Sequence, residues 1–467
     1  MTYLHIVIAV VLSLRVLARS QLIPSTRVVW ILILIVVPFG GAILYLLVGE
    51  VHFGGSALAR LNRAKAATRN LVAASGALTD IARWGGASAY ATTINGFGVT
   101  AGNAGELLAS PAGARARLVA DIDAAQESVD VLYYIWLDDH TGRDVADALK
   151  RAAARGVRCR AMVDAIGSHA MIRSETWASL PRAGVETAVA LPLGNIFRTM
   201  LSRRIDLRNH RKITLIDGRI CHCGSQNCAD PEFRVKPRFA PWVDIMVRFE
   251  GPVAHQMQLL FLQDWMTVHT VDLDAIAGPS APLPDGFHAQ VVGTGPATSR
   301  DVTAQLFSRL IFDARRELVI STPYFVPGEI VSQAIMGAAR AGVQVTLILP
   351  ARNDSGFVAR ASRSYYPGLV EAGVKIVEFH GGLLHSKTLT IDGEVTFMGS
   401  SNLDIRSFDL NFENDVLLRD KTLTQAVRAR QMEYAAASTP VDPAAVRAWP
   451  LARRIWLNVF TVIGPVL

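Results

Sequence analysis

The sequence predicts an α/β protein made of two similar halves that follow an apolar N-terminal segment. Beyond residue 110, apolar strands alternate with amphipathic helices, and the order helix, strand, helix, strand occurs twice. Each half then presents the same polar residues at identical spacings, and two apolar runs before residue 50 indicate membrane helices. A chain of 467 residues is longer than one hydrophobic core usually organises, which fits this plan.

Composition narrows the class of partner but not its identity. A formal net charge of +7 favours an anionic partner, which includes nucleic acid, an acidic lipid surface and a phosphorylated substrate. Four cysteines in so long a chain do not resemble the disulfide framework of a small secreted protein. Charge and cysteine content therefore leave both the compartment and the substrate open.

The confident membrane prediction is a transmembrane helix over residues 28–48, an uncharged apolar run of the length that crosses a hydrocarbon core. Pro38 beside Gly40 predicts a kink within it. Trp30 and Tyr45 lie near its ends, where amphipathic rings favour the membrane interface. Residues 1–50 are accordingly predicted to be a membrane anchor.

A shorter apolar run at residues 4–18 admits three interpretations. It ends near Arg15, so a short span with a snorkelling arginine, a re-entrant segment and an interfacial helix all fit, and we favour the short span. A cleaved signal peptide fits less well, because no lysine or arginine precedes the run. Basic residues flank both runs almost equally, so the positive-inside rule leaves the side of the catalytic part undecided.

The repeat sets the predicted domain organisation. In the first half, helices at 118–128 and 144–155 alternate with strands at 129–134 and 157–163; in the second half, helices at 306–316 and 330–340 alternate with strands at 318–321 and 342–349. The predicted boundaries are a linker or juxtamembrane region at 51–109, domains at 110–280 and 286–440, and a basic C-terminal segment at 441–467. For that last segment, lying on anionic lipid and packing on the core are equally consistent with the pattern.

The repeated polar pattern is the strongest functional signal. Its members are His210, Lys212, Asp217, Gly224, Ser225 and Asn227 in the first half and His385, Lys387, Asp392, Gly399, Ser400 and Asn402 in the second. Histidine and lysine two residues apart on a strand share one face. The following Asp-Gly pair is typical of a tight hairpin, which returns the chain toward the Gly-Ser-x-Asn segment.

This set of side chains suits phosphodiester transfer. One neutral imidazole attacks phosphorus while a second histidine protonates the departing alcohol. The two lysines, together with Ser225, Asn227, Ser400 and Asn402, are candidates for holding the phosphoryl oxygens, so the chemistry requires no metal. The alternative, that both histidines are ordinary core residues with a satisfied hydrogen bond, is far weaker, because each is followed by a lysine at the same spacing.

Other polar residues are assigned with alternatives. Asp244 and Glu413 are candidates for orienting the two histidines, and the alternative is a solvated strand end. Asp217 and Asp392 belong to the predicted catalytic set, although Asp-Gly is also an ordinary turn sequence. The Cys221-His222-Cys223 cluster invites a zinc interpretation, but a second cysteine pair at metal spacing is missing, so small residues in a strand are favoured.

The paired His-x-Lys-x4-Asp patterns with their trailing Gly-Ser-x-Asn resemble the phospholipase D superfamily, and within it the bacterial cardiolipin synthases. The similarity covers nearly the whole chain and includes Pro38, Gly41 and residues 43–45, as well as residues 322–327. Residues 228–233 depart from the common family sequence, which bears on acceptor preference.

The resemblance implies two phospholipase D-like domains, layered α/β/α with mixed sheets, in a pseudo-twofold arrangement behind transmembrane helices. It implies His210 as the nucleophile that forms a phosphatidyl-histidine, and His385 as general acid and then base. One phosphatidylglycerol would donate its phosphatidyl group to a second and release glycerol, with no cofactor, at the bacterial inner membrane. The expected partners are phosphatidylglycerol and an anionic bilayer, not nucleic acid.

Three other functions remain as alternatives. A phospholipase D hydrolase or a phosphatidylserine-synthase-like enzyme differs only in the accepting alcohol. A nuclease uses the same pair of histidines, but it has no need of the apolar N-terminal segment. A non-catalytic scaffold would not require both copies of the polar pattern to be intact, and both are intact.

Overall fold

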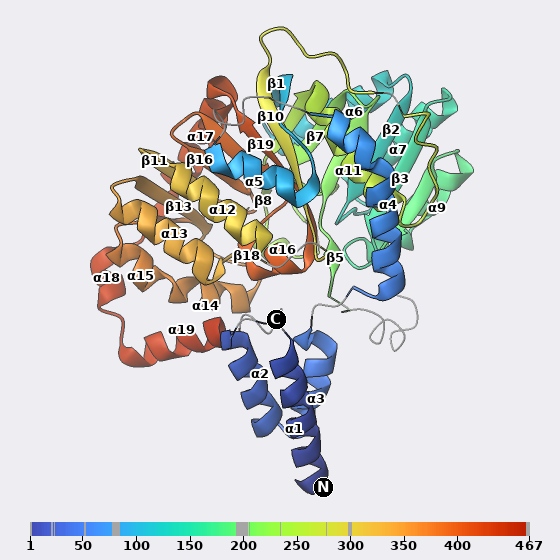
Figure 1. The fold of residues 1–467 in the computed structure, drawn as a ribbon. Helices are drawn as coiled ribbons and strands as arrows, with labels where there is room; N and C mark the ends of the chain where they lie inside the picture. The colour runs from blue at the N-terminus through green and yellow to red at the C-terminus, as the bar shows by residue number, and fades with distance from the viewer. Residues whose placement is uncertain are drawn as a thin grey trace.

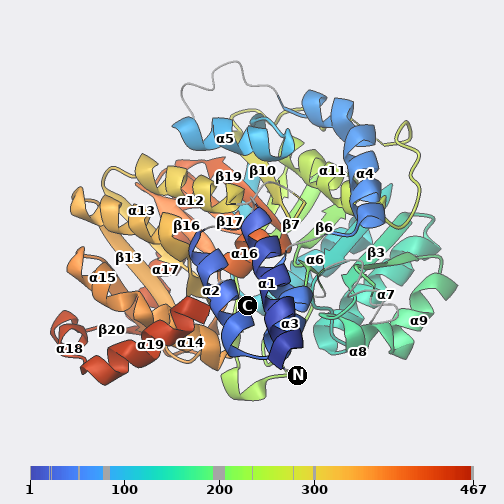
Figure 2. The same cartoon turned by 60° about the horizontal axis from the view of Figure 1, so that its bottom comes forward.

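The computed structural model describes residues 2–19, 22, 24–50, 53–76, 85–192, 204, 206–233, 235–276, 278–297 and 301–463. Two α/β halves lie side by side around a shared central sheet, and a small bundle of helices projects from the body (Figure 1). Figure 2 shows the same bundle from its free end, with the two halves on either side behind it.

The projecting bundle is a helical hairpin formed by the N-terminal elements α1 (Thr2–Ala18), α2 (Pro24–Val36), α3 (Gly40–Leu44) and η1 (Tyr45–Gly49). The α2 helix runs antiparallel to α1, since the ring of His5 contacts the carbonyl oxygen of Ile35 at 3.3 Å. The chain then returns through α3, and Arg15 near the end of α1 forms an ion pair with Glu50 at 2.6 Å. Trp30 and Tyr45 pack edge to face inside the hairpin.

The predicted transmembrane helix over 28–48, with its kink at Pro38, is not found as one helix, because the chain turns between Val36 and Gly40. Pro38 lacks the backbone N–H that a continuing helix requires, and it disfavours helical geometry at the residue before it. Phe39 then adopts a left-handed conformation with a φ of 56°. Among the described residues, no helix combines the length and apolar character needed to cross a membrane.

The first half alternates strands and helices as the sequence predicts. The α6 helix begins after Ser110, whose hydroxyl caps the backbone N–H of Gly113, and α7 begins after Asp139, which caps Gly142. The elements are β1 (Thr100–Leu107), α6 (Pro111–Ala124), β2 (Ser128–Tyr133), α7 (His140–Ala154), β3 (Arg158–Asp164), α8 (His169–Ile172), α9 (Glu175–Arg182), β4 (Glu186–Ala190), β5 (Arg208–Asn209), β6 (Lys212–Ile216), β7 (Ile220–Gly224), η3 (Pro237–Phe239), β8 (Trp242–Val243), β9 (Met246–Glu250) and α11 (Pro252–Trp265).

The second half repeats this order. Its elements are β10 (Phe287–Thr294), α12 (Val302–Asp313), β11 (Glu317–Ser321), β12 (Phe325–Val326), α13 (Gly328–Arg340), β13 (Gln344–Pro350), α14 (Gly356–Ser364), α15 (Tyr366–Glu371), β14 (Lys375–Phe379), β15 (Leu383–Leu384), β16 (Thr388–Ile391), β17 (Val395–Gly399), β18 (Leu403–Asp404), α16 (Ile405–Asp409), β19 (Asn411–Arg419) and α17 (Lys421–Ala436). The predicted strands at 129–134 and 318–321 correspond to β2 and β11.

One continuous mixed sheet runs through both halves. One end of this sheet is β20 (Ser438–Pro440). In the described part of the chain the strand order is β20-β14-β13-β11-β16-β17-β19-β10-β1-β9-β7-β6-β2-β3-β4, which is that of two equivalent sheets joined edge to edge by β1 and β10. The strands β2, β3 and β4 are parallel, as are β11, β13 and β14. Helices cover both faces (Figure 1), which explains why these strands are largely buried.

The region predicted as a linker, 51–109, contributes to the folded core. Its helices α4 (Gly55–Ala74) and α5 (Gly85–Asn95) pack against α11 and α12, and β1 pairs with β9 and β10. At the other end of the chain, β20 (Ser438–Pro440) pairs with β14, and α18 (Pro443–Arg447) packs on α15. The last helix, α19 (Leu451–Ile463), packs on α14.

Candidate active site

The two repeated histidines lie where the halves meet, because each one follows a short strand that pairs with the other half. The β5 strand before His210 pairs with β19, and β15 before His385 pairs with β8. The His210 N–H donates to the carbonyl of Phe412 at 2.9 Å, and the His385 N–H donates to the carbonyl of Val243 at 2.8 Å. Backbone pairing across the halves therefore brings both histidines to one junction.

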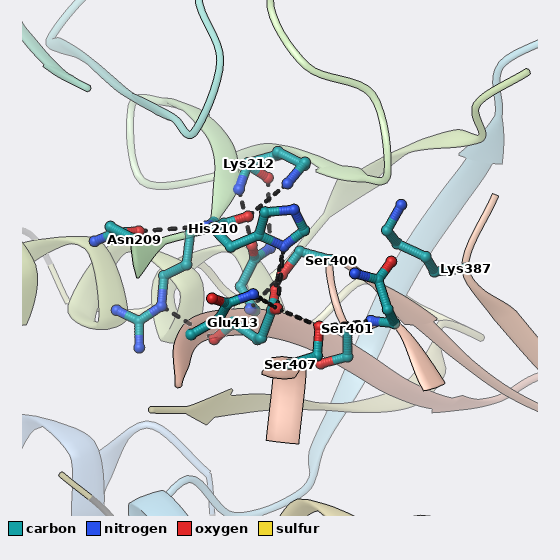
Figure 3. A network of polar contacts seen from close by, with 12 residues as sticks. Asn209, His210, Lys212, Lys387, Ser400, Ser401, Ser407 and Glu413 are labelled. Carbon is teal, nitrogen blue, oxygen red and sulfur yellow. Dashed lines mark hydrogen bonds and ion pairs between the residues drawn. The ribbon is translucent and has the colours of Figure 1, made fainter. Parts of the chain in front are cut away.

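Each histidine is oriented by a carboxylate of the opposite half. His210 Nδ1 lies 2.8 Å from Glu413 Oε2, and His385 Nδ1 lies 2.6 Å from Asp244 Oδ1. A ring held through Nδ1 directs its other nitrogen, Nε2, away from the carboxylate, and this fixes both its tautomer and its orientation. Figure 3 shows Glu413 beneath the His210 ring, with Lys212 on the opposite side of that ring.

The two carboxylates differ in how many other groups they bind. Glu413 also accepts hydrogen bonds from the hydroxyls of Ser400 and Ser407 and from the amide of Asn411. Asp244 accepts a hydrogen bond from Ser225 at 2.6 Å. Because more donors share the charge of Glu413, the two histidines do not have equivalent environments.

Both lysines are buried beside the histidines that precede them. Lys212 Nζ donates to the carbonyl of His210 at 2.6 Å, and Lys387 Nζ donates to the carbonyl of His385 at 2.7 Å. Burial lowers the pKa of Lys212 to about 8 and that of Lys387 to about 7, although the neighbouring carboxylates oppose this shift. A bound anion would favour the charged form of both side chains.

The electrostatics keep both imidazoles neutral in the ligand-free site. Burial, reinforced by Lys212 and Lys387, lowers the pKa of His210 and of His385 to about 4 against the opposing effect of their carboxylates. Burial would raise the pKa of Asp244, but its contacts with His385, Lys387 and Ser225 dominate and lower it to about 2. Each crossed pair thus combines a neutral imidazole with an ionised carboxylate.

Two aromatic residues that sequence reasoning missed stand beside the histidines. The ring of Tyr134 lies 4.8 Å from that of His210, and the ring of Trp242 lies 4.4 Å from that of His385. Tyr134 directly follows β2, and Trp242 begins β8, which pairs with the strand before His385. In the sequence, the feature that could have identified both aromatic residues is their position at the ends of predicted strands.

The predicted phosphate-binding residues lie around the same junction. The hydroxyls of Ser225 and Ser400 are turned to the carboxylates of Asp244 and Glu413. Asn227 accepts a hydrogen bond from the N–H of Ile135 at 3.3 Å. Among the described residues, the buried Oδ1 atom of Asn402 has no hydrogen-bond partner, and its role toward phosphate stays a prediction.

Asp217 and Asp392, predicted members of the catalytic set, lie at the far ends of β6 and β16 from the two histidines, and a catalytic role for them stays a prediction. Both adopt left-handed backbone conformations, with φ values of 52° and 53°, in the turns after β6 and β16. Asp217 accepts the N–H groups of residues 126–128, and Asp392 accepts those of residues 315–317. A strand separates each aspartate from its histidine by roughly 20 Å at about 3.3 Å per residue. The two carboxylates therefore attach the turns after β6 and β16 to the chain that enters β2 and β11.

The Cys221-His222-Cys223 residues lie within β7. Cys221, Cys223 and Cys228 are buried thiols within or beside β7, and His222 points to the other face, where its Nε2 lies 2.7 Å from Asp121. Arg248 binds the same carboxylate at 2.7 Å. In the part of the chain that the structure describes, no group of three metal-ligating side chains comes together.

A cavity of about 390 Å³ adjoins the junction on the side of the first half. Asn209 and Phe412, the neighbours of His210 and Glu413, contribute to its wall. Other lining residues come from α4, from the ends of β3 and β4 and from the end of α11: Ala57, Arg60, Leu61, Met162, Val189, Ala190 and Asp264. Its lining is mainly apolar, with one arginine and one carboxylate.

Comparison with known proteins relates nearly the whole chain to proteins with phospholipase D-like domains. Residues 118–265 and 307–433 match the family described as cardiolipin synthase, PLD-like domain, and residues 6–50 match the phospholipase D-nuclease N-terminal family. Cardiolipin synthase A of Edwardsiella ictaluri is 35% identical over 97% of this chain and 95% of its own length. Cardiolipin synthase A of Yersinia pseudotuberculosis is also 35% identical, with the same coverage.

The fold has a counterpart among solved structures. The phosphatidylserine synthase of Haemophilus influenzae Rd KW20 superposes with a TM-score of 0.57 and 14% sequence identity, covering 78% of this chain and 95% of that one. At this identity the similarity concerns the fold alone.

Proposed function

The chain belongs to the cardiolipin synthase family with PLD-like domains, and on that premise we propose that it is a phosphatidyltransferase that makes cardiolipin and glycerol from two phosphatidylglycerol molecules. The observation that carries the proposal is the crossed pairing of His210 with Glu413 and His385 with Asp244. This pairing supplies two oriented imidazoles at one junction, one to attack phosphorus in its neutral form and one to carry a proton, which is what a two-step transfer to and from a histidine needs.

In the first step, Nε2 of His210 attacks the phosphorus of the donor. The bond from phosphorus to the glycerol headgroup oxygen breaks as the nitrogen–phosphorus bond forms, and His385 gives a proton to the departing oxygen. The negative phosphodiester between Lys212 and Lys387 raises the affinity of a facing imidazole for that proton. Asp244 stabilises the resulting imidazolium of His385.

In the second step, His385 acts as a base. It takes the proton from a hydroxyl of the second phosphatidylglycerol, whose oxygen then attacks the phosphorus and releases His210. Glu413 holds the His210 ring in one orientation through both steps, and the two lysines balance the charge of the phosphoryl oxygens. The same geometry transfers the group to water if water reaches the intermediate, which is the hydrolase alternative.

The apolar surroundings suit a lipid substrate. The cavity lined by Asn209 and Phe412 is formed mainly by apolar side chains, a lining that suits an acyl chain. The N-terminal hairpin carries exposed apolar residues such as Leu14, Leu32 and Leu46. We place the enzyme at the bacterial cell membrane, attached through this hairpin.

The decisive experiment measures products from labelled phosphatidylglycerol. Purified protein is mixed with the labelled lipid alone or with added phosphatidylethanolamine, and products are identified by mass spectrometry. Cardiolipin and free glycerol from phosphatidylglycerol alone are the expected result, and His210→Ala and His385→Ala should each abolish them in folded protein. Phosphatidic acid as the sole product would support a hydrolase, and cleavage of DNA without lipid turnover would reject the proposal.

A further inference from the structure

The last helix of the chain presents its apolar face outward. In α19, Leu451, Ile455, Val459 and Val462 form one stripe at helical spacing, with exposed fractions of 69%, 57%, 42% and 58%. Trp456, at 56% exposed, widens this stripe. A helix at the surface of a water-soluble protein normally turns such a stripe toward the core. An apolar stripe that faces outward therefore indicates a surface that another molecule covers.

Contacts on the opposite face hold the helix in this orientation. Leu457 is buried against the body, and the ring of Phe460 packs edge to face on Phe357 of α14 at 5.5 Å. The hydroxyl of Thr461 hydrogen-bonds Ser364, also on α14. The apolar stripe therefore cannot turn inward without breaking the packing between α14 and α19.

The α19 helix lies on the side of the molecule from which the hairpin projects (Figures 1 and 2). The α19 helix runs across the base of the second half toward the root of the hairpin, in both views of the fold (Figures 1 and 2). The hairpin also exposes apolar side chains along its length: Leu4, Val7, Val11, Leu14, Val28, Leu32, Ile35, Ile43 and Leu46. Two separate elements, one from each end of the chain, thus expose apolar surface on one side.

The proposed active site adjoins that side. The ring of Phe53, just after the hairpin, packs edge to face on Phe412, the neighbour of Glu413, at 5.6 Å. On the second half, α14 packs on both α19 and β12. Figure 1 places β5, β18 and α16, which surround the junction, at the hairpin end of the body.

We propose that α19 is an interfacial helix that lays this stripe on an anionic phospholipid surface, so that α19 and the hairpin together turn the active site toward that surface. The charges select the occupant: Arg453 and Arg454 lie on α19 itself, Arg360 lies over the Phe460 ring, and α19 has no acidic residue. An anionic membrane offers the complementary charge and a place for Trp456.

A probe at position 455 tests this contact. The four native cysteines are buried, so Ile455→Cys can be labelled selectively with an environment-sensitive fluorophore on the full-length, folded protein. With vesicles of phosphatidylcholine and phosphatidylglycerol, its emission should shift to the blue and be quenched by lipids with nitroxide-labelled chains. With phosphatidylcholine alone, the change should be smaller. The matched control is Asp147→Cys on α7, where the exposed label should not respond.

Two results would overturn the proposal. The first is a fluorophore at position 455 that remains in water while the protein floats with the vesicles, since attachment would then use the hairpin alone. The second is the same blue shift on raising protein concentration without lipid, which would make a second copy the occupant. Repeating the measurement in the His385→Ala background separates surface binding from transfer chemistry, because the probe should respond equally in an inactive protein.

Discussion

At the scale of single residues, the crossing of carboxylates explains how one site arises from two similar halves. His210 depends on Glu413 from the second half, and His385 depends on Asp244 from the first. The sequence identifies all four side chains, but it does not reveal which carboxylate serves which histidine. Chain proximity favours pairing within a half, whereas the pairing of β5 with β19 and of β15 with β8 decides the opposite.

Removing the charge of each carboxylate should impair a different step. We expect Glu413→Gln to slow formation of the phosphatidyl-histidine about 100-fold or more, because the His210 ring loses its orienting partner. With a donor whose leaving group needs no proton, Asp244→Asn should instead accumulate the covalent intermediate, since His385 can no longer activate the acceptor well. Intact-protein mass spectrometry measures the intermediate. Accumulation in both variants, or in neither, would contradict the assigned roles.

The pKa shifts predict a bell-shaped dependence of kcat/KM on pH. Protonation of the nucleophile removes its lone pair, so activity should fall as the pH drops through the histidine pKa of about 4. Lys387 and Lys212, with pKa values of about 7 and 8, lose their positive charge as the pH rises, so phosphate binding should weaken there. Initial rates of glycerol release between about pH 3 and pH 10 measure both limbs.

Lys387→Arg separates the lysine contribution, because arginine stays protonated throughout this range. The alkaline limb should move to higher pH even if the maximal rate falls. An unchanged alkaline limb in this variant would show that another group controls it.

Asp217 and Asp392 should matter for stability rather than for chemistry. We expect Asp217→Ala to lower the free energy of unfolding by about 1–3 kcal/mol, because it leaves backbone N–H groups without an acceptor. Asp217→Asn should cost less, since asparagine keeps an acceptor oxygen and tolerates the left-handed backbone. Thermal unfolding measures both, and the rate per folded molecule should stay near that of the wild type. A large loss of turnover in a stable Asn variant would restore the catalytic assignment.

At the scale of elements, local patterns predict the repeated strands and helices well. The predicted helix at 330–340 and strand at 318–321 match α13 and β11 closely, because their apolar periodicity decides the structure. The β1 strand and the reversal of the chain after Val36 were missed for physical reasons. The β1 strand at 100–107 is defined by its distant partners β9 and β10, and the break after Val36 depends on how Pro38 ends one helix and reverses the chain.

The hairpin depends on a close approach of backbone at Gly41. A Cβ atom at that position would lie 2.5 Å from the carbonyl oxygen of Ile33, so Gly41→Val should separate α3 from α2. We expect faster proteolysis within residues 24–49 and an unchanged melting temperature of the α/β body. The control is Gly55→Ala, where an added Cβ meets nothing within 4 Å. Equal protection in both variants would contradict this account of the turn.

At the scale of the whole molecule, the two halves form one sheet through β1 and β10. Fragments 1–280 and 281–467 should each be inactive alone, because each holds a histidine without its carboxylate. Coexpression should restore cardiolipin formation in a complex that purifies together, and coexpression with Glu413→Gln in the second fragment should not. Turnover by the first fragment alone would refute the dependence of one half on the other.

The crossed histidine–carboxylate pairs also constrain how such a chain changes over time. A mutation that removes a carboxylate in one repeat impairs the histidine of the other repeat. The sequence of one repeat therefore cannot change at these positions, or be replaced by that of another protein, independently of its partner. A protein with a single repeat would complete such a site only as a homodimer with twofold symmetry. Covalent fusion removes that need for an encounter, and it frees the two repeats to specialise, one as attacker and one as proton carrier.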